Sequence, residues 1–209
     1  MMTEPRQQRA VKTREAIVYA AAHVFDECGY SGASISKIMD HAGVTQGGMY
    51  FHFKSKQELA RVVMEKQQEF VAFPVGEASL QRLIDLTFFM AHALQTNVLV
   101  RASVRLAVEQ GEFGKPDPTA YHEWVDQLCF FLYAARERGE LLDEVDEREF
   151  AILLTGAFAG MQIYSNIATG REDLNERLVA WWKYTLPALA PAHVQAALVM
   201  RPYSREQAA

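Results

Sequence analysis

Apolar residues recur at helical spacing through almost the whole chain, and this periodicity constrains the fold more than any other feature. One buried helix face is predicted by the i, i+4, i+7, i+8, i+11 spacing of Ile17, Ala21, Val24, Phe25 and Cys28. Gly29 follows, and glycine readily takes the left-handed conformation that ends a helix. No alternation of β-branched and polar residues between turn signals calls for strands. We therefore expect an all-α protein.

Breaker residues divide the rest of the chain into further helices. Ser55 is suited to cap one helix, with Glu58 at the capping-box position, and Pro74 and Gly76 end it. Later helices are expected at 79–95, 98–112, 120–138, 147–168 and 172–188. The cluster Phe130, Phe131 and Tyr133 is interpreted as core. We place a domain boundary at residue 56, giving domains 1–56 and 57–209.

Residues 34–53, SISKIMDHAGVTQGGMYFHF, have the pattern of two short helices joined by a tight turn. Ser34 is a good N-cap for a first helix that buries Ile35 and Ile38. Gly43 makes the turn, and Val44 is expected to fill the angle between the helices. This is the arrangement of a helix-turn-helix, in which the second helix enters the DNA major groove. An ordinary glycine turn over a small core is the alternative interpretation.

The helix-turn-helix interpretation identifies a set of candidate DNA contacts. Gln46 can pair with an adenine edge or contact a phosphate, and Gly47 lets the backbone approach closely. Tyr50 and His52 are placed to touch phosphates, or else simply cap the small core. Lys56 opens the next helix, where the helix dipole also favours an anion. The full candidate set is Ser34, Lys37, Thr45, Gln46, Gly47, Tyr50, His52 and Lys56.

Charge is distributed unevenly along the chain. The net charge of −5 alone argues against a nucleic-acid partner, but residues 1–56 carry seven Lys or Arg and five acids, a balance of +2. The remainder carries −7. This asymmetry favours a DNA-facing end attached to an acidic body.

The block from Lys12 to Leu59 resembles the N-terminal domain of the TetR family of repressors. The resemblance is carried by TREAIVYAAAHVFDECGY, by ASISKIMDHAGVTQGGMYFHF and by the following SKQEL. It implies a three-helix DNA-binding head, a fourth connecting helix, and an all-helical body that binds a ligand and dimerises. The expected protein is a repressor that binds a pseudo-palindromic operator as a homodimer.

Within that family, GVTQGGMYFHFKSKQELA is similar to the γ-butyrolactone-type autoregulator receptors. Those receptors typically have Thr-Lys-Gly-Ala-Leu-Tyr-Phe-His-Phe here, so Gln46 replaces a lysine and Gly48 an alanine. The resemblance implies release from DNA by a small hydrophobic γ-butyrolactone or butenolide and control of secondary-metabolite genes. A drug- or metabolite-sensing repressor of an efflux or catabolic gene is the alternative.

The acidic body supplies candidate ligand contacts. NVLVRASVRLAVEQ and YHEWVDQL resemble the same receptors, which implies that Trp124 lies in the ligand pocket. An alkyl-tailed lactone needs an apolar slot and a few polar groups that fix its ring. The candidates are Gln67, Gln68, Phe88, Val104, Tyr121, Trp124, Leu128, Phe158 and Gln162. Phe88, Val104, Leu128 and Phe158 fit plain core better than a ligand wall, and the polar candidates fit a solvent-exposed position as well as the pocket.

The helices expected at 147–168 and 172–188 look like a dimerisation pair. Gly156 and Gly160 allow close helix approach. Trp181 and Trp182 diverge by about 100° on a helix, so both cannot be buried on one face. We expect one of them to cover an interface.

The chain lacks the sequence motifs that are typical of other function classes. No His-Glu-x-x-His, Gly-x-Ser-x-Gly, phosphate loop or Glu-x-x-His occurs, so we expect no enzyme, no metal and no cofactor. A protein-interaction module without DNA affinity stays open. No run of about 18 apolar residues and no signal-like N-terminus occur, so we expect no membrane association and a cytoplasmic protein.

Overall fold

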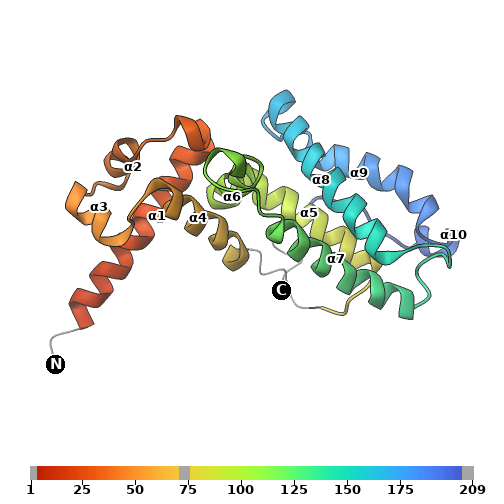
Figure 1. Ribbon diagram of the computed structural model, residues 1–209. Helices are drawn as coiled ribbons and strands as arrows, with labels where there is room; N and C mark the ends of the chain where they lie inside the picture. Colours follow the sequence, from red (N-terminus) through yellow and green to blue (C-terminus); the bar gives the residue numbers. More distant parts are fainter. Residues whose placement is uncertain (1–3, 71–75, 204–209) are drawn as a thin grey trace. The chain divides into compact units, whose positions relative to one another are not determined.

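A computed structural model describes residues 4–70 and 76–203, and these contain helices and no strand. The long helices are α1 (Glu4–Gly32), α4 (Lys56–Phe70), α5 (Leu80–Thr96), α6 (Val98–Val108), α7 (Thr119–Glu137), α8 (Glu147–Thr169) and α9 (Leu174–Thr185). Short elements are α2 (Ile35–Ala42), α3 (Gln46–His52), η1 (Gln110–Glu112), η2 (Leu186–Ala188) and α10 (Ala192–Gln195) (Figure 1). The all-α expectation is confirmed.

The helices form two compact units. The first contains Met1–Ala72 and Asn97–Asp117, and the second contains Phe73–Thr96 and Pro118–Ala209. These units differ from the predicted division at residue 56, because α4 and α6 pack against α1 in the first unit. The interpretation from sequence could not place α6 there, because that contact joins helices far apart in the chain.

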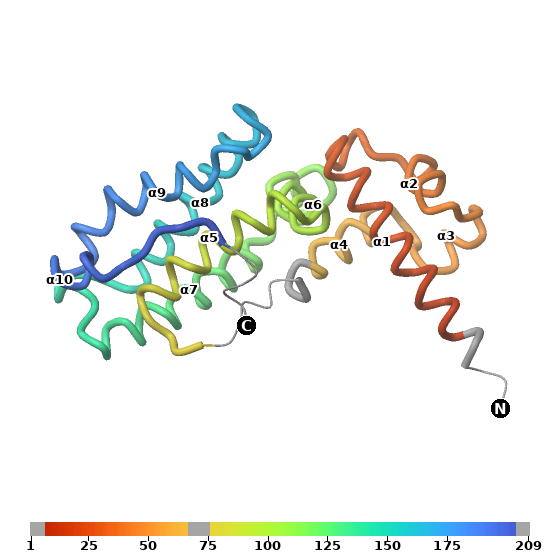
Figure 2. The backbone as a smooth tube through the Cα atoms, turned by 180° about the vertical axis from the view of Figure 1, so that it is seen from behind, coloured from red at the N-terminus to blue at the C-terminus, as the bar shows by residue number. Residues whose placement is uncertain are grey.

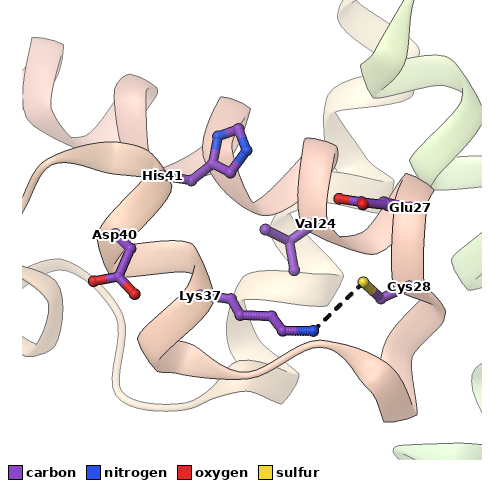
Figure 3. A pocket seen from close by; sticks show the side chains of 6 residues that line it. All are labelled: Val24, Glu27, Cys28, Lys37, Asp40 and His41. Carbon is purple, nitrogen blue, oxygen red and sulfur yellow. Dashed lines mark hydrogen bonds between the residues drawn. The ribbon is translucent and has the colours of Figure 1, made fainter.

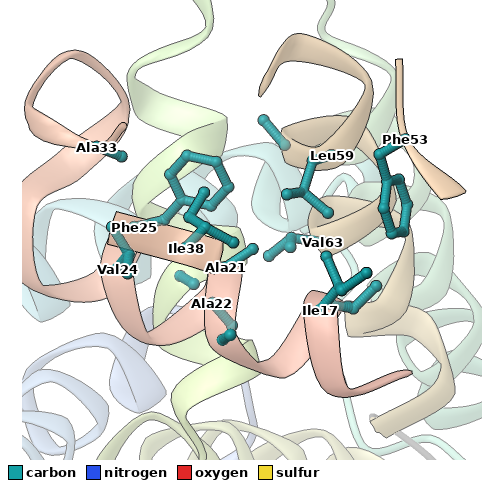
Figure 4. Close-up of a cluster of buried hydrophobic side chains, with 14 of the residues drawn as sticks. Ile17, Ala21, Ala22, Val24, Phe25, Ala33, Ile38, Phe53, Leu59 and Val63 are labelled. Carbon is teal, nitrogen blue, oxygen red and sulfur yellow. The ribbon is translucent and has the colours of Figure 1, made fainter. Parts of the chain in front are cut away.

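The first unit is built on the apolar face of α1. Ile17, Ala21, Val24 and Phe25 are buried as predicted, whereas Cys28 is half-buried (Figure 4). Ile38, Phe53 and Leu59 cover this face from α2, the end of α3 and α4. α1 is interrupted at Gly29, which has φ 71, and then continues to Gly32. A single apolar cluster thus fixes α2 and α3 against α1 and α4.

The second unit packs α5 against α7 and α9, and α8 against α7 and α9. Trp182 is completely buried, and its indole Nε1–H donates to Thr87 Oγ1 at 3.0 Å, which links α9 to α5. Glu147 at the start of α8 accepts from Arg136 Nε on α7 at 2.6 Å. Figure 2 shows the four long helices of this unit from behind. The expected positions of these helices agree with the structure to within a few residues.

Candidate functional site

The α2–turn–α3 segment has the geometry that its capping residues predict. Ser34 Oγ accepts from the Lys37 backbone N–H at 3.2 Å, and Thr45 Oγ1 accepts from the Gly48 N–H at 3.2 Å. Gly43 ends α2 with φ 63, and Val44 packs half-buried against the core. A side-chain oxygen therefore caps the N-terminus of each helix, and Gly43 ends α2. This is a helix-turn-helix.

The surface of α3 divides into a buried and an exposed face. Met49 is buried, and Phe53, which caps the helix C-terminally, is also buried. Thr45, Gln46 and Gly47 are exposed, and the Tyr50 side chain is 48% exposed. The first turn of α3 therefore presents short or polar side chains at the surface. Such a turn can approach base edges closely.

The other DNA-contact candidates differ in how available their side chains are. Ser34 and Lys37 are exposed at the start of α2, and Lys37 Nζ lies 3.8 Å from Cys28 Sγ. His52 is half-buried and packs edge-on against Phe51, with ring centroids 4.9 Å apart. Phosphate contacts by these residues stay predictions.

Lys56 has partners within its own unit. Its ammonium donates to the carbonyl oxygens of Tyr30 at 2.8 Å and Ala33 at 2.9 Å, and it lies 4.2 Å from the centroid of the Tyr30 ring. In this structure Lys56 thus binds the end of α1. A phosphate contact would have to share or displace these hydrogen bonds.

Two features of the first unit were not identified from the sequence. Phe51 is 78% exposed on α3. Its i, i+4 spacing from Gly47 places both residues on one helix face, and this spacing could have predicted the exposure. Glu109 at the end of α6 accepts from the Tyr30 backbone N–H at 2.7 Å, and Arg105 holds the same carboxylate at 2.8 Å. No local sequence pattern predicts the contact between Glu109 and Tyr30, because the two residues are 79 positions apart in the chain.

A hollow of about 520 Å³ lies between α1 and α2 (Figure 3). Its lining residues are Val24, Glu27, Cys28, Lys37, Asp40 and His41. Four of these six carry a charge or an imidazole, and only one is aliphatic. The lining therefore lacks the apolar wall that an alkyl tail requires. It includes none of the predicted ligand contacts.

The ligand-contact candidates fall into different environments. In the second unit, Phe88 and Leu128 are buried, whereas Tyr121, Trp124 and Phe158 are half-buried. Val104 lies on α6 in the first unit and is half-buried. Gln67 and Gln68 lie in α4, and their side chains are outside the described residues. A pocket formed by these residues stays a prediction.

Gln162 belongs to a buried polar cluster. Its side chain is 2% exposed, and its Oε1 accepts from Arg171 Nη2 at 3.3 Å. Arg171 Nη1 also donates to Asn166 Oδ1 at 2.7 Å, and the Arg171 backbone has a positive φ of 73. The Arg171 carbonyl oxygen accepts from Gln95 Nε2 at 2.7 Å. Gln162 is thus oriented by the loop that joins α8 and α9.

An exposed apolar face runs along α8. Ala151, Leu154, Gln162 and Ser165 point into the second unit. The opposite side exposes Ile152, Leu153, Ile163, Tyr164 and Ile167, with Gly156 and Gly160 between them. Tyr184 on α9 is exposed, and Trp181 is half-buried beside the buried Trp182. The prediction that only one of the two tryptophans is buried is confirmed.

The aromatic cluster on α7 corrects one expectation. Phe131 on α7 is buried, but Phe130 and Tyr133 are exposed, because they lie on the side of α7 turned away from α5 and α8. Among the described residues, α8 is long and apolar enough by composition to cross a membrane, a test that the core helix of a protein without a membrane span also passes. Only 22% of its apolar window is buried. A large exposed apolar face marks an interaction surface.

Comparison with known proteins places this helix-turn-helix chain in a family. Residues 17–63 match the model of the bacterial regulatory proteins of the tetR family. The A-factor receptor protein of Streptomyces griseus is 38% identical over 88% of this chain, which spans 66% of that receptor's length.

Solved structures agree over nearly the full chain. Full-length native TylP, a TetR regulator from Streptomyces fradiae, is 38% identical with a TM-score of 0.80, covering 96% of this chain and 95% of that one. A γ-butyrolactone receptor described as an ArpA-like protein is 29% identical with a TM-score of 0.74, covering 91% and 93%. The chain belongs to the TetR family of bacterial regulatory proteins. It is a transcriptional regulator and not an enzyme.

Proposed function

We propose that this chain is a dimeric, cytoplasmic repressor that binds a pseudo-palindromic operator through α3 and is released by a small hydrophobic lactone. The exposed, capped first turn of α3 is the observation that carries the DNA-binding part. Similarity to the A-factor receptor protein and to a γ-butyrolactone receptor supports the ligand class. The regulated genes are those of secondary metabolism.

In this proposal α3 reads base edges and its flanking residues position it. Gln46 and Gly47 approach the bases, while Lys37, Tyr50 and His52 contact phosphates. Ser34 and Thr45 have their side chains engaged as helix caps, so they support the two helices and reach phosphates only at the edge of the interface. Lys56 contributes by holding the end of α1 against α4.

The ligand part of the proposal places the lactone in the second unit. Trp124 supplies a flat wall and one N–H donor, and Tyr121 lies one turn before it on α7. Phe88, Leu128 and Phe158 form the apolar slot. Gln162 fixes the lactone ring once its hydrogen bond from Arg171 is replaced by one with the ligand. Val104, Gln67 and Gln68 belong to the first unit, so the proposed site in the second unit does not include them.

Dimerisation follows from the exposed apolar face of α8. Burying that face together with Tyr184 and Trp181 on α9 against a second copy removes a large apolar surface from water. The small residues Gly156 and Gly160 let the two copies of α8 approach closely. A two-fold dimer places two copies of α3 on two half-sites.

Release requires that the ligand bind one state of the dimer more tightly than the other. Moving the population from 99:1 to 1:99 takes about 5.5 kcal/mol of differential affinity. Each CH₂ of an alkyl tail that becomes buried supplies roughly 0.8 kcal/mol. A lactone with a tail of several carbons therefore suffices.

The test is fluorescence anisotropy of the purified protein on duplexes tiling the DNA upstream of its own gene. γ-Butyrolactones and butenolides are then titrated into any complex that forms. Tight binding reversed by one panel member is the expected result. Binding without release by any member would discard the lactone and favour a drug- or metabolite-sensing repressor. Absence of salt-dependent binding to every duplex would overturn the repressor and favour an interaction module.

A further inference from the structure

The N-terminal end of α1 is helix with no core beneath it. α1 begins at Glu4, and from residue 7 onward the first buried residue is Ile17. Of positions 7–16, only Ala10 and Thr13 are even half-buried. These turns project past α3 and α4 in both views (Figures 1 and 2). At about 1.5 Å per residue, the extension from residue 4 to residue 16 is roughly 20 Å long.

This extension is strongly basic. Positions 6, 9, 12 and 14 are Arg, Arg, Lys and Arg, and no acid occurs from residue 5 to residue 14. The side chains of Arg9 and Lys12 are exposed, and neither forms an ion pair with any residue that the structure describes. Positions 6, 9 and 12 follow one i, i+3 row along the helix. The partner that fits such a row is a polyanion.

One contact connects the extension to the proposed DNA-reading helix. The guanidinium carbon of Arg14 lies 5.2 Å from the centroid of the Phe53 ring. Phe53 is the C-cap of α3, and its backbone N–H donates to the Met49 carbonyl oxygen. The basic turns of α1 therefore start beside the C-terminal end of α3.

We propose that residues 6–12 of α1 bind duplex phosphates next to the bases that α3 reads. This inference rests on the proposed function, because the polyanion is taken to be operator DNA. A helix of this length without packing is marginal in water. Phosphate contacts stabilise it in the complex, and they add affinity that does not depend on base sequence.

The test compares salt dependence of DNA binding by the full chain and a double variant, Arg9→Gln with Lys12→Gln. Anisotropy is recorded from low to high salt on the tightest upstream duplex and on a mixed-sequence duplex of equal length. Each lost phosphate contact lowers the slope of log K against log salt by about one. We expect the double variant to lower it by about two on both duplexes.

Two matched variants make the result specific. Arg61→Gln with Lys115→Gln removes the same charge from exposed positions elsewhere in the first unit and is expected to keep the wild-type slope. Arg9→Lys with Lys12→Arg retains both charges and is also expected to keep it. Circular dichroism checks that the helix content of all three variants is unchanged.

The outcomes separate this inference from the function it rests on. If the wild-type chain binds DNA and the Arg9/Lys12 variant has the same slope, the α1 contact is overturned and the repressor stands. A slope lowered equally by the Arg61/Lys115 variant also overturns the α1 contact, because the effect is then one of net charge. If the wild-type chain binds no duplex, the proposed function fails, and this inference fails with it.

Discussion

The Glu109 carboxylate at the end of α6 accepts a hydrogen bond from the Tyr30 backbone N–H at 2.7 Å. Tyr30 directly follows Gly29, where the helical conformation of α1 is interrupted. Arg105 binds the same carboxylate at 2.8 Å and also donates to the Asp26 carbonyl oxygen at 2.8 Å. Within the first unit, α6 therefore holds the segment of α1 that leads into α2. A displacement of α6 would reach the helix-turn-helix through this contact.

Gly29→Ala is expected to destabilise the protein beyond the cost of its backbone conformation. An added Cβ would lie 2.7 Å from Arg105 Nη2 and 2.8 Å from Glu109 Oε1, which displaces the carboxylate from Tyr30. Gly43→Ala is the comparison for a positive φ alone, because Gly43 has φ 63 and ψ 34 with nothing within 4 Å of its Cβ position, whereas Gly29 has φ 71 and ψ −179, a conformation that is essentially restricted to glycine. Positive-φ strain costs roughly 1–3 kcal/mol for Gly43→Ala, and the backbone strain of Gly29→Ala is larger. Losing the charged hydrogen bond adds about 1–3 kcal/mol at Gly29.

A double-mutant cycle checks this reason. In a Glu109→Ala background the excess cost of Gly29→Ala over Gly43→Ala should fall by about 1–3 kcal/mol in urea unfolding, while the part due to backbone conformation stays. An excess that persists unchanged would show that the Glu109–Tyr30 contact is not its source.

Trp182→Phe is expected to cost about 2–4 kcal/mol of unfolding free energy. The indole is fully buried, so the smaller ring leaves a cavity and leaves the Thr87 hydroxyl without its donor. Trp181→Phe, one position away on the half-buried side, should change monomer stability by under about 0.5 kcal/mol. Equal effects in thermal unfolding of the two variants would contradict the assignment.

Leu153→Glu is expected to shift the chain from dimer to monomer. Leu153 is exposed on α8, and a carboxylate there would be buried without a partner in a two-fold interface. Val108→Glu, at an exposed site on α6, serves as the control. Sedimentation equilibrium measures the dimer fraction. If Leu153→Glu leaves it unchanged, the dimer uses another face.

Gln46→Lys is expected to strengthen DNA binding and steepen its salt dependence. The substitution restores the lysine typical of the autoregulator receptors, at an exposed position of α3. One added phosphate contact raises the magnitude of the slope of log K against log salt by about one. Ala192→Lys, exposed in the second unit, should leave the slope unchanged. A slope that does not move in Gln46→Lys would mean that its side chain points away from the backbone of the duplex.

Asp173 should contribute stability at neutral pH that is lost in acid. Hydrogen bonds from Arg177, and then from Ser165 and Thr169, hold the pKa of its carboxyl well below the ordinary value of 3.8. Because the pKa is lowered in the folded state, the contribution is present above the unfolded pKa and declines as pH falls below it. Asp173→Asn should therefore be less stable than wild type near pH 7, and the difference should shrink below about pH 4. Asp143→Asn, at an exposed carboxylate, should show no such trend in urea unfolding.

Local chemistry explains which parts of the fold were predictable. Ser34, Thr45 and Ser55 cap their helices as expected, because a cap bonds an N–H only two or three residues away. The buried face of α1 followed directly from helical periodicity. Glu58 also bonds back across the start of α4, accepting from the Lys54 N–H at 2.7 Å.

The candidate sites were predictable only in part. The exposure of Gln46 and Tyr50 agrees with the helix-turn-helix interpretation, whereas Phe51 was overlooked on the same helix. The expectation that Phe130 and Tyr133 lie in the core was wrong. A cluster of aromatic residues in the sequence does not show which side of its helix faces a neighbouring helix. Packing of α7 against α5 and α8 decides that.

The amino-acid sequence by itself determined the helices and the helix-turn-helix, because periodicity, caps and glycine turns act within a few residues, and its resemblance to known repressors indicated the TetR family. The tertiary structure alone decided which helices share a unit and which side chains are already engaged. Lys56 binds the end of α1, Glu109 reaches Tyr30 across 79 positions, and Gln162 turns toward Arg171. These contacts depend on how helices pack in three dimensions, where residues distant in sequence compete for the same buried hydrogen-bonding groups.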